Sequence, residues 1–185
     1  MKTMKILSGG VELAQFTAAD TQALYDVRNH ESVRSFMANP APLAIEAHRE
    51  WTRTHLLEGA DVLLFMIRAG GAPCGFSVLK RLSADRAEIG VMVRDAAQRP
   101  IVASIAATAT LHCAFERLSF ETLVSWVRPE HRRALGFNQA FGGVEVPSEK
   151  PGMLQFRLSR SECLRNERYR RLRARLGTRL TGQTG

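Results

Sequence analysis

Apolar side chains recur at strand-like spacing in the first half of the chain. Residues 11–16 alternate apolar and polar side chains, as a strand does when one of its faces is buried. Residues 61–69 and 74–80 are apolar runs on either side of a glycine- and proline-containing turn at 70–73. Such a pattern predicts a hairpin. The first strand therefore precedes an antiparallel strand pair.

Helical spacing separates the first strand from that hairpin. Thr17 is a suitable N-cap for a helix that we expect to end near Asn29. Residues 31–37 predict a short second helix, which ends before a loop with two prolines. Residues 44–57 place apolar and histidine side chains at helical intervals, and Gly59 follows where a C-terminal glycine is common.

The second half of the chain predicts a strand, a long helix and another strand, at residues 86–94, 100–118 and 120–128. Pro100 suits the first position of a helix because its missing N–H is not needed there. A strand–helix–strand unit implies a right-handed parallel crossover. A helix at 130–141 and a hairpin of 144–146 with 153–158 complete the elements. The predicted fold class is α/β, a mixed and mostly antiparallel sheet with one parallel pair, flanked by helices.

The strand at residues 86–94 has two different faces, because strand side chains alternate. One face carries Ala87, Ile89, Val91 and Val93, and the other carries Glu88, Gly90, Met92 and Arg94. We expect the first face to be core, with Glu88 on the opposite side.

Composition bounds the class of protein. The 185 residues, 45% apolar and 24% charged, suit one ordinary globular domain. The longest apolar runs, at 62–67 and 101–109, are shorter than the ~20 residues that span a bilayer, and residues 1–10 lack the apolar stretch of a signal peptide. The three cysteines form no Cys-x-x-Cys pair, and the five histidines show no metal-ligand spacing. We expect a cytoplasmic protein with no membrane partner and no metal.

Positive charge is concentrated at the C-terminal end. Residues 1–150 hold 17 basic and 16 acidic side chains, whereas residues 151–185 hold nine arginines and two glutamates. The pattern at 161–176 predicts a basic amphipathic helix with Leu164, Tyr169, Leu172 and Leu176 on one face, and residues 177–185 are expected to fray. We therefore divide the chain into a domain at 1–159 and a basic C-terminal helix with a flexible tail at 160–185.

Three consecutive segments carry a family resemblance. Residues 88–103 (EIGVMVRDAAQRPIVA), 113–118 (CAFERL) and 124–142 follow one another with an order and spacing that resemble the second half of the GNAT N-acetyltransferase superfamily. Residues 27–30 (VRNH) and 46–48 (EAH) resemble its branch that acetylates ribosomal proteins and nucleotide-linked amino sugars. The resemblance implies acetyl-coenzyme A (acetyl-CoA) as donor and an amine as acceptor. It also implies that the cofactor lies where the two parallel strands separate.

The pyrophosphate loop departs from the family pattern. That pattern is Gln or Arg, two residues, Gly, one residue, then Gly or Ala, and here Gln98 and Ala103 keep its ends while Ile101 replaces the first glycine. Pro100 also removes one donor amide. Arg99 is either a compensating charge or a solvated arginine. The cofactor-binding residues that the resemblance implies are Met92, Val93, Arg94, Gln98, Arg99, Ile101, Val102, Ala103 and Asn138.

Acetyl transfer to an amine requires a group that takes the proton of the amine, whose pKa of ~10 keeps it protonated at neutral pH. Glu88 is the candidate base, and a solvated strand carboxylate is the alternative. His131 stands where relatives often have a cofactor-contacting asparagine, and is either a proton carrier or an ordinary histidine at a helix start. Asn138 lies near the position of the family's tyrosine acid, which this sequence lacks.

The acceptor is expected to meet the first two helices and the strands beside them. The candidates for substrate binding are Arg28, Asn29, Phe36, Met37, Trp51 and Trp126, of which the apolar ones also suit a core. The predicted function is N-acetylation of a small primary amine, such as a nucleotide-linked amino sugar, by a monomer or homodimer. The alternative is a catalytically degenerate GNAT-fold binding or regulatory protein, with nucleic-acid association through the arginine-rich tail as a less favoured addition.

Overall fold

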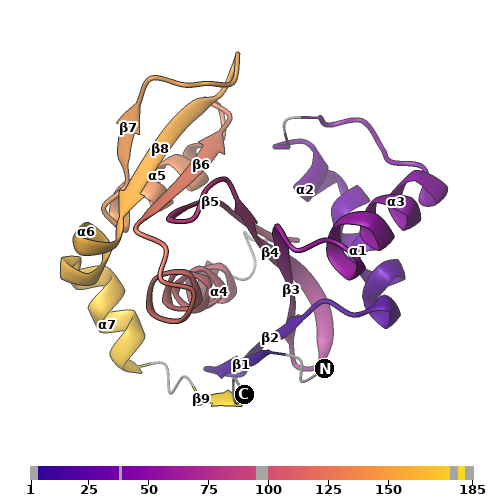
Figure 1. The fold of residues 1–185 in the computed structure, drawn as a ribbon, viewed down its shortest axis with the longest axis horizontal. Helices are drawn as coiled ribbons and strands as arrows, with labels where there is room; N and C mark the ends of the chain where they lie inside the picture. The colour runs from indigo at the N-terminus through magenta and orange to yellow at the C-terminus, as the bar shows by residue number, and fades with distance from the viewer. Residues whose placement is uncertain (1–3, 38, 95–99, 176–178, 182–185) are drawn as a thin grey trace.

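The computed structural model describes residues 4–37, 39–94, 100–175 and 179–181. Its strands form one sheet in the order β7-β8-β6-β5-β4-β3-β2-β1-β9 (Figure 1). The strands are β1 (Lys5–Ser8), β2 (Val11–Gln15), β3 (Val62–Ala69), β4 (Ala72–Arg81), β5 (Arg86–Val93), β6 (Thr122–Val127), β7 (Val144–Val146), β8 (Leu154–Ser159) and β9 (Arg179–Thr181).

Among the described strands, β5 and β6 are the one parallel pair, and the other neighbours are antiparallel. The predicted mixed sheet is therefore confirmed, including both hairpins. Two short strands are additions to the prediction. β1 precedes the predicted first strand, and β9, in a segment expected to fray, pairs with β1.

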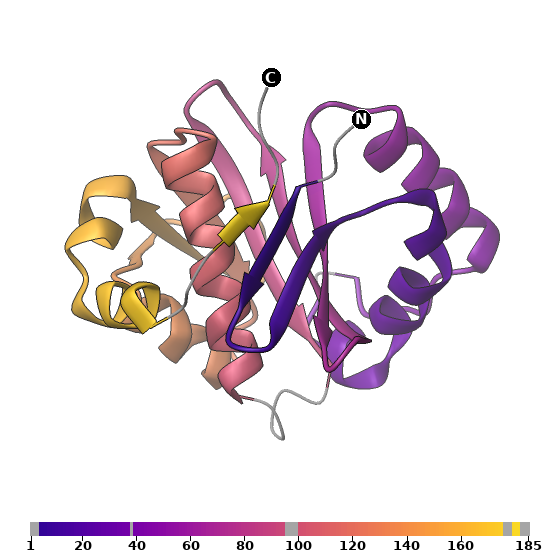
Figure 2. The same cartoon turned by 90° about the horizontal axis from the view of Figure 1, so that it is seen from below.

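Helices cover both faces of the sheet, as Figures 1 and 2 show. On one side lie η1 (Ala18–Asp20), α1 (Thr21–Asn29), α2 (Glu31–Arg34) and α3 (Ile45–Thr52), which continues as a π-helical turn, η2 (Arg53–Leu57). On the other side lie α4 (Pro100–His112), its continuation η3 (Cys113–Arg117), and α7 (Glu167–Arg175), which α6 (Arg160–Arg165) precedes. α5 (Arg132–Ala140) follows β6.

Each face of the sheet has its own apolar core. The larger core joins α4 and the sheet through residues such as Ala87, Ile105 and Leu123, and it extends to Tyr169 of α7. The smaller core joins α1 to β3 and β4 through Leu24, Met66 and Phe76, with the half-buried Met92 packed against it. β5 thus contributes to both cores. The face with Ala87 and Val93 is core as predicted, whereas the packing of Met92 on a second core was not predicted.

Local capping explains where the C-terminal helix differs from the prediction. The predicted helix at 161–176 is two helices, α6 and α7, with Asn166 in extended conformation between them. The Asn166 side chain accepts a hydrogen bond from the Tyr169 amide at 2.9 Å, which is how an N-cap starts a new helix. The break turns Tyr169 into the core, where it is 2% exposed, while Leu164 is 37% exposed. Leu172 packs on the core as predicted, Leu164 was assigned wrongly, and Leu176 lies outside the described residues.

Candidate functional site

The parallel pair of strands separates partway along its length. β5 and β6 are in register at Arg86 with Thr122, Ala87 with Leu123 and Glu88 with Val124. Beyond Glu88, β5 continues to Val93 in register with β4, and β6 continues in register with β8. Each strand therefore follows its outer neighbour, and β6, β8 and β7 turn away from the rest of the sheet (Figure 1). Glu88 lies at the last paired position before this opening.

The long helix α4 starts at the same end of the sheet, because it follows β5 and returns along it. The first N–H groups of a helix have no partner within the helix and attract anions. Val102 is 6% exposed and packs in the core, whereas Ile101 is 60% exposed. The isoleucine at the family's glycine position is therefore exposed and is not packed in the core. Ala103 is half-buried, and Gln98 and Arg99 lie outside the described residues.

A carboxylate, an ammonium and an indole meet at the last paired position of the parallel strands. The Lys150 ammonium lies 3.5 Å from Glu88 Oε1 and 3.6 Å from the centroid of the Trp126 ring. Glu88 and Trp126 share the sheet face opposite the larger core, because Glu88 pairs with Val124, two residues before Trp126. The structure thus brings one predicted catalytic residue to one predicted acceptor residue. Lys150 belongs to no motif in the sequence, and it was not predicted as a site residue.

The loop after α2 reaches the start of α5. The Phe36 ring stacks on His131 with centroids 3.8 Å apart, and Arg128 Nε donates to the Met37 carbonyl at 3.0 Å. Partial burial, followed by the nearby Arg133, lowers the pKa of His131 below its ordinary value. His131 is therefore neutral at pH 7. Three predicted site residues, Phe36, Met37 and His131, come together here.

Asn138 is held by its own neighbourhood. Its Oδ1 accepts from Ser125 Oγ of β6 at 2.6 Å, and its Nδ2 donates to the Ala134 carbonyl at 2.8 Å. These bonds fix α5 on β6 and leave the amide one further N–H.

Two other predicted acceptor residues hold a loop. The Asn29 amide exchanges two hydrogen bonds with the backbone of Leu43, at 2.9 and 3.1 Å. Arg28 Nη2 donates to the Asn39 carbonyl at 3.0 Å. Arg28 Nη1 is buried and has no hydrogen-bond partner among the described residues. The Asn29 amide and one nitrogen of Arg28 therefore bind the backbone of the segment between α2 and α3.

The remaining candidates have simple environments. Trp51 is 40% exposed and stacks on His55. Val93 is buried in the larger core, and Met92 packs on the smaller one. The backbone N–H of Arg94 donates to the Cys74 carbonyl at 2.8 Å, which keeps the end of β5 on β4.

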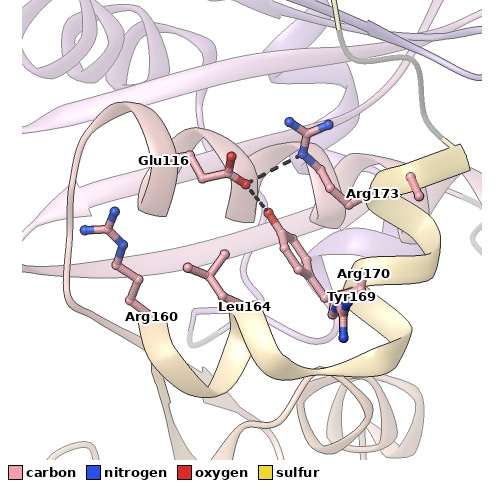
Figure 3. Close-up of a pocket in the computed structure, with 7 residues that line it drawn as sticks. Glu116, Arg160, Leu164, Tyr169, Arg170 and Arg173 are labelled. Carbon is pink, nitrogen blue, oxygen red and sulfur yellow. Dashed lines mark hydrogen bonds and ion pairs between the residues drawn. The ribbon is translucent and has the colours of Figure 1, made fainter.

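An open pocket of about 550 Å³ lies away from this region, between η3, α6 and α7 (Figure 3). Glu116 Oε1 there accepts from the Tyr169 hydroxyl at 2.9 Å and lies 2.8 Å from His112 Nδ1 and 3.6 Å from Arg173 Nε. Partial burial alone would raise the pKa of Glu116, but the hydrogen bonds from His112 and Tyr169 outweigh it and lower the pKa. Glu116 thus joins η3 to Tyr169 and Arg173 of α7, so we interpret the pocket as the junction where α7 docks.

The described residues provide no sign of a reactive thiol, a membrane span or a metal site. Cys74, Cys113 and Cys163 are buried and form no disulfide with one another, and burial raises the pKa of the Cys113 and Cys163 thiols to about 12. Such thiols are unreactive at neutral pH. In the described part of the chain, no helix is long and apolar enough to cross a membrane. The same residues contain no group of three or more His, Cys, Asp or Glu side chains placed to hold a metal ion.

The comparison with protein families gives the class of this protein, since the model of the acetyltransferase (GNAT) domain matches residues 11–144. The chain belongs to the GNAT N-acetyltransferase family and is an acyltransferase.

Solved structures share this fold at low sequence identity. A spermidine N-acetyltransferase from Vibrio cholerae, in complex with CoA and spermine, has a TM-score of 0.73 and 15% identity, over 84% of this chain and 98% of that one. FdhC, a nucleotide-linked sugar GNAT, has a TM-score of 0.75 and 16% identity, over 91% of this chain and 97% of that one. No curated protein matches the chain in sequence.

Proposed function

We propose that this protein transfers the acetyl group of acetyl-CoA to a primary amine of a small molecule, with Glu88 as the base. The observation that carries the proposal is the end of the parallel ladder at Glu88 and Val124. A carboxylate at this position borders the opening between the strands, which is where the family resemblance expects the cofactor.

We expect the start of α4 to bind a diphosphate despite the altered loop. Ile101 is 60% exposed, so its side chain is not packed in the core and can turn away from a ligand at the helix start. The backbone amides of Ile101, Val102 and Ala103 are the proposed donors, with Gln98 and Arg99 as predicted contributors. Proline at the first position removes one donor, so we expect weaker diphosphate binding than in a glycine-rich loop.

Acetyl-CoA, when bound, supplies the acetyl group and a thiolate leaving group. The protein's part is to bind the acceptor and to take its proton, and Glu88 does this directly or through a water. Tyr25 packs against His48 and Tyr169 bonds to Glu116, so neither tyrosine is placed to act as an acid. A thiol of pKa ~8.5 leaves adequately without one. His131, neutral at pH 7, is the second candidate for moving a proton.

One of the two similar structures is a complex with CoA and spermine, and the other is described as a nucleotide-linked sugar GNAT. Phe36, Met37 and Trp126 are the proposed acceptor contacts beside Glu88 and His131. Arg28 Nη2 already donates a hydrogen bond to the Asn39 carbonyl, which weakens the predicted role of Arg28 in binding a nucleotide phosphate.

Two measurements test this function. Isothermal titration with acetyl-CoA is expected to show saturable binding, and no heat at high micromolar concentration would favour a degenerate GNAT-fold binding protein. With an acceptor found from a panel of polyamines and nucleotide amino sugars, Glu88→Gln should lower kcat by about 10²–10⁴-fold with unchanged acetyl-CoA affinity. Glu12→Gln is the matched control, because Glu12 is 27% exposed and pairs with Lys5 much as Glu88 pairs with Lys150.

A further inference from the structure

Lys150 places its positive charge against two predicted site residues. Its ammonium contacts the Glu88 carboxylate at 3.5 Å and stands 3.6 Å over the Trp126 ring. We propose that Glu88 and Trp126 form a subsite for an alkylammonium group, and that Lys150 fills this subsite until the acceptor displaces it. The inference rests on the proposed function in one respect, since it assigns the subsite to the acceptor amine.

The two groups suit an alkylammonium ion for different reasons. The carboxylate supplies a full negative charge, and the face of an indole is the best aromatic surface for a cation. A protonated primary amine on an alkyl chain satisfies both, as the lysine side chain does. A neutral alcohol of the same length satisfies neither. The subsite therefore selects cationic amines, and the carboxylate that binds the ammonium is the one that later takes its proton.

The loop that carries Lys150 is held independently of the lysine head group. Glu149 pairs with Arg86 at 3.1 Å, and its backbone N–H donates to Gln155 Oε1 at 2.9 Å. Gln155 is 3% exposed and lies opposite Trp126 in β8. The loop is thus fastened to a buried side chain beside the indole, so that it presents Lys150 at a fixed place.

The Lys150 side chain itself can leave. It is 42% exposed, and Glu88 is 29% exposed, so water screens the pair and the contact is weak. An acceptor must then displace a single flexible side chain. If Lys150 fills the subsite in about nine tenths of the molecules, the apparent affinity for another ammonium falls about tenfold.

A titration of Trp126 fluorescence tests the subsite directly. The chain has two tryptophans, so Trp51→Phe leaves Trp126 as the sole reporter. The probe is n-butylammonium chloride at constant ionic strength, and 1-butanol is the neutral control. In this background, Lys150→Ala should bind butylammonium about tenfold more tightly than its parent. Lys150→Gln should behave in the same way, which guards against a folding defect of one variant.

Two further variants serve as controls for the butylammonium titration. Adding Glu88→Gln to Lys150→Ala should abolish the tighter binding, whereas Lys5→Ala, which removes a lysine of 44% exposure from its pair with Glu12, should change nothing. Absence of saturable binding in both Lys150 variants refutes the subsite, as does equal binding of butanol. Acetyl-CoA titrations of the same proteins separate the two proposals. Ammonium binding without acetyl-CoA binding overturns only the transferase function, and the reverse result overturns only the subsite.

Discussion

Tyr169 is the side chain whose replacement best tests how the C-terminal helices belong to the fold. It is 2% exposed, its ring lies in the larger core, and its hydroxyl donates to Glu116 at 2.9 Å. A hydrogen bond to a charged group contributes about 1.5–3 kcal/mol. The Glu116 side chain is 34% exposed and keeps His112 as a partner, so the lower end applies. Tyr169→Phe should therefore cost about 1.5 kcal/mol, or roughly 3–6 °C in Tm for a chain of this size.

Removing the ring as well should cost much more. Tyr169→Ala opens a cavity between α7 and the core, and deleting a buried aromatic ring costs about 3–5 kcal/mol. The control is Leu164→Ala, because Leu164 is 37% exposed and a surface substitution changes stability by less than about 0.5 kcal/mol. Urea denaturation followed by circular dichroism measures all three. A larger loss for Leu164→Ala than for Tyr169→Ala would refute the docking of α7 described above.

Further predictions concern protonation, thiol access and the chain end. The pKa of Glu116 is lowered in the folded state. Its contribution to stability is therefore present above the unfolded pKa of about 4.3 and is lost as the pH falls through the lower folded pKa. Over this pH range, the difference in urea midpoint between the wild type and Glu116→Gln should fall to zero. The pKa of His131 is lowered mainly by burial, so its NMR titration midpoint should lie below about 6.5, and Phe36→Ala should raise it. Ellman's reagent should label none of the three cysteines in the native protein and all of them in denaturant; fast native labelling would contradict their burial. Truncation after Ser159 removes Cys163 and Tyr169 from the core, so the shortened chain should lose its cooperative thermal transition.

That last expectation changes how nucleic-acid association can be tested. A truncated chain that unfolds reports nothing about the arginines themselves. Arg165, Arg168, Arg170 and Arg171 are exposed on α6 and α7, and their joint replacement by glutamine keeps Tyr169 in place. Salt-dependent DNA retention that persists in this variant would eliminate the tail as a nucleic-acid surface.

The sequence determined the strands, helices and caps, because these depend on residues that are close together in the chain. Alternation and helical spacing predicted the strands β2 to β6, the β7–β8 hairpin and the long helix, because burying one face imposes a period. Thr17 marked the first helix boundary, and its amide and hydroxyl both donate to Asp20 Oδ2. The parallel crossover followed from element order alone, and the alternation of residues 86–94 placed Glu88 opposite the larger core.

The tertiary structure decided which residues from distant segments meet. Lys150 reaches Glu88 across 62 positions of sequence, and Arg128 reaches Met37 across 91. No local pattern encodes such contacts, because they depend on loop paths. The same limit applies to β1 and β9, which are too short to show a period; β1 pairs with both β2 and β9, and β9 pairs with β1. Tyr169 lies in the core as its place on the predicted apolar face requires, but Leu164 of the same predicted face does not. The cap at Asn166 starts a second helix, and the break changes the direction of the first face.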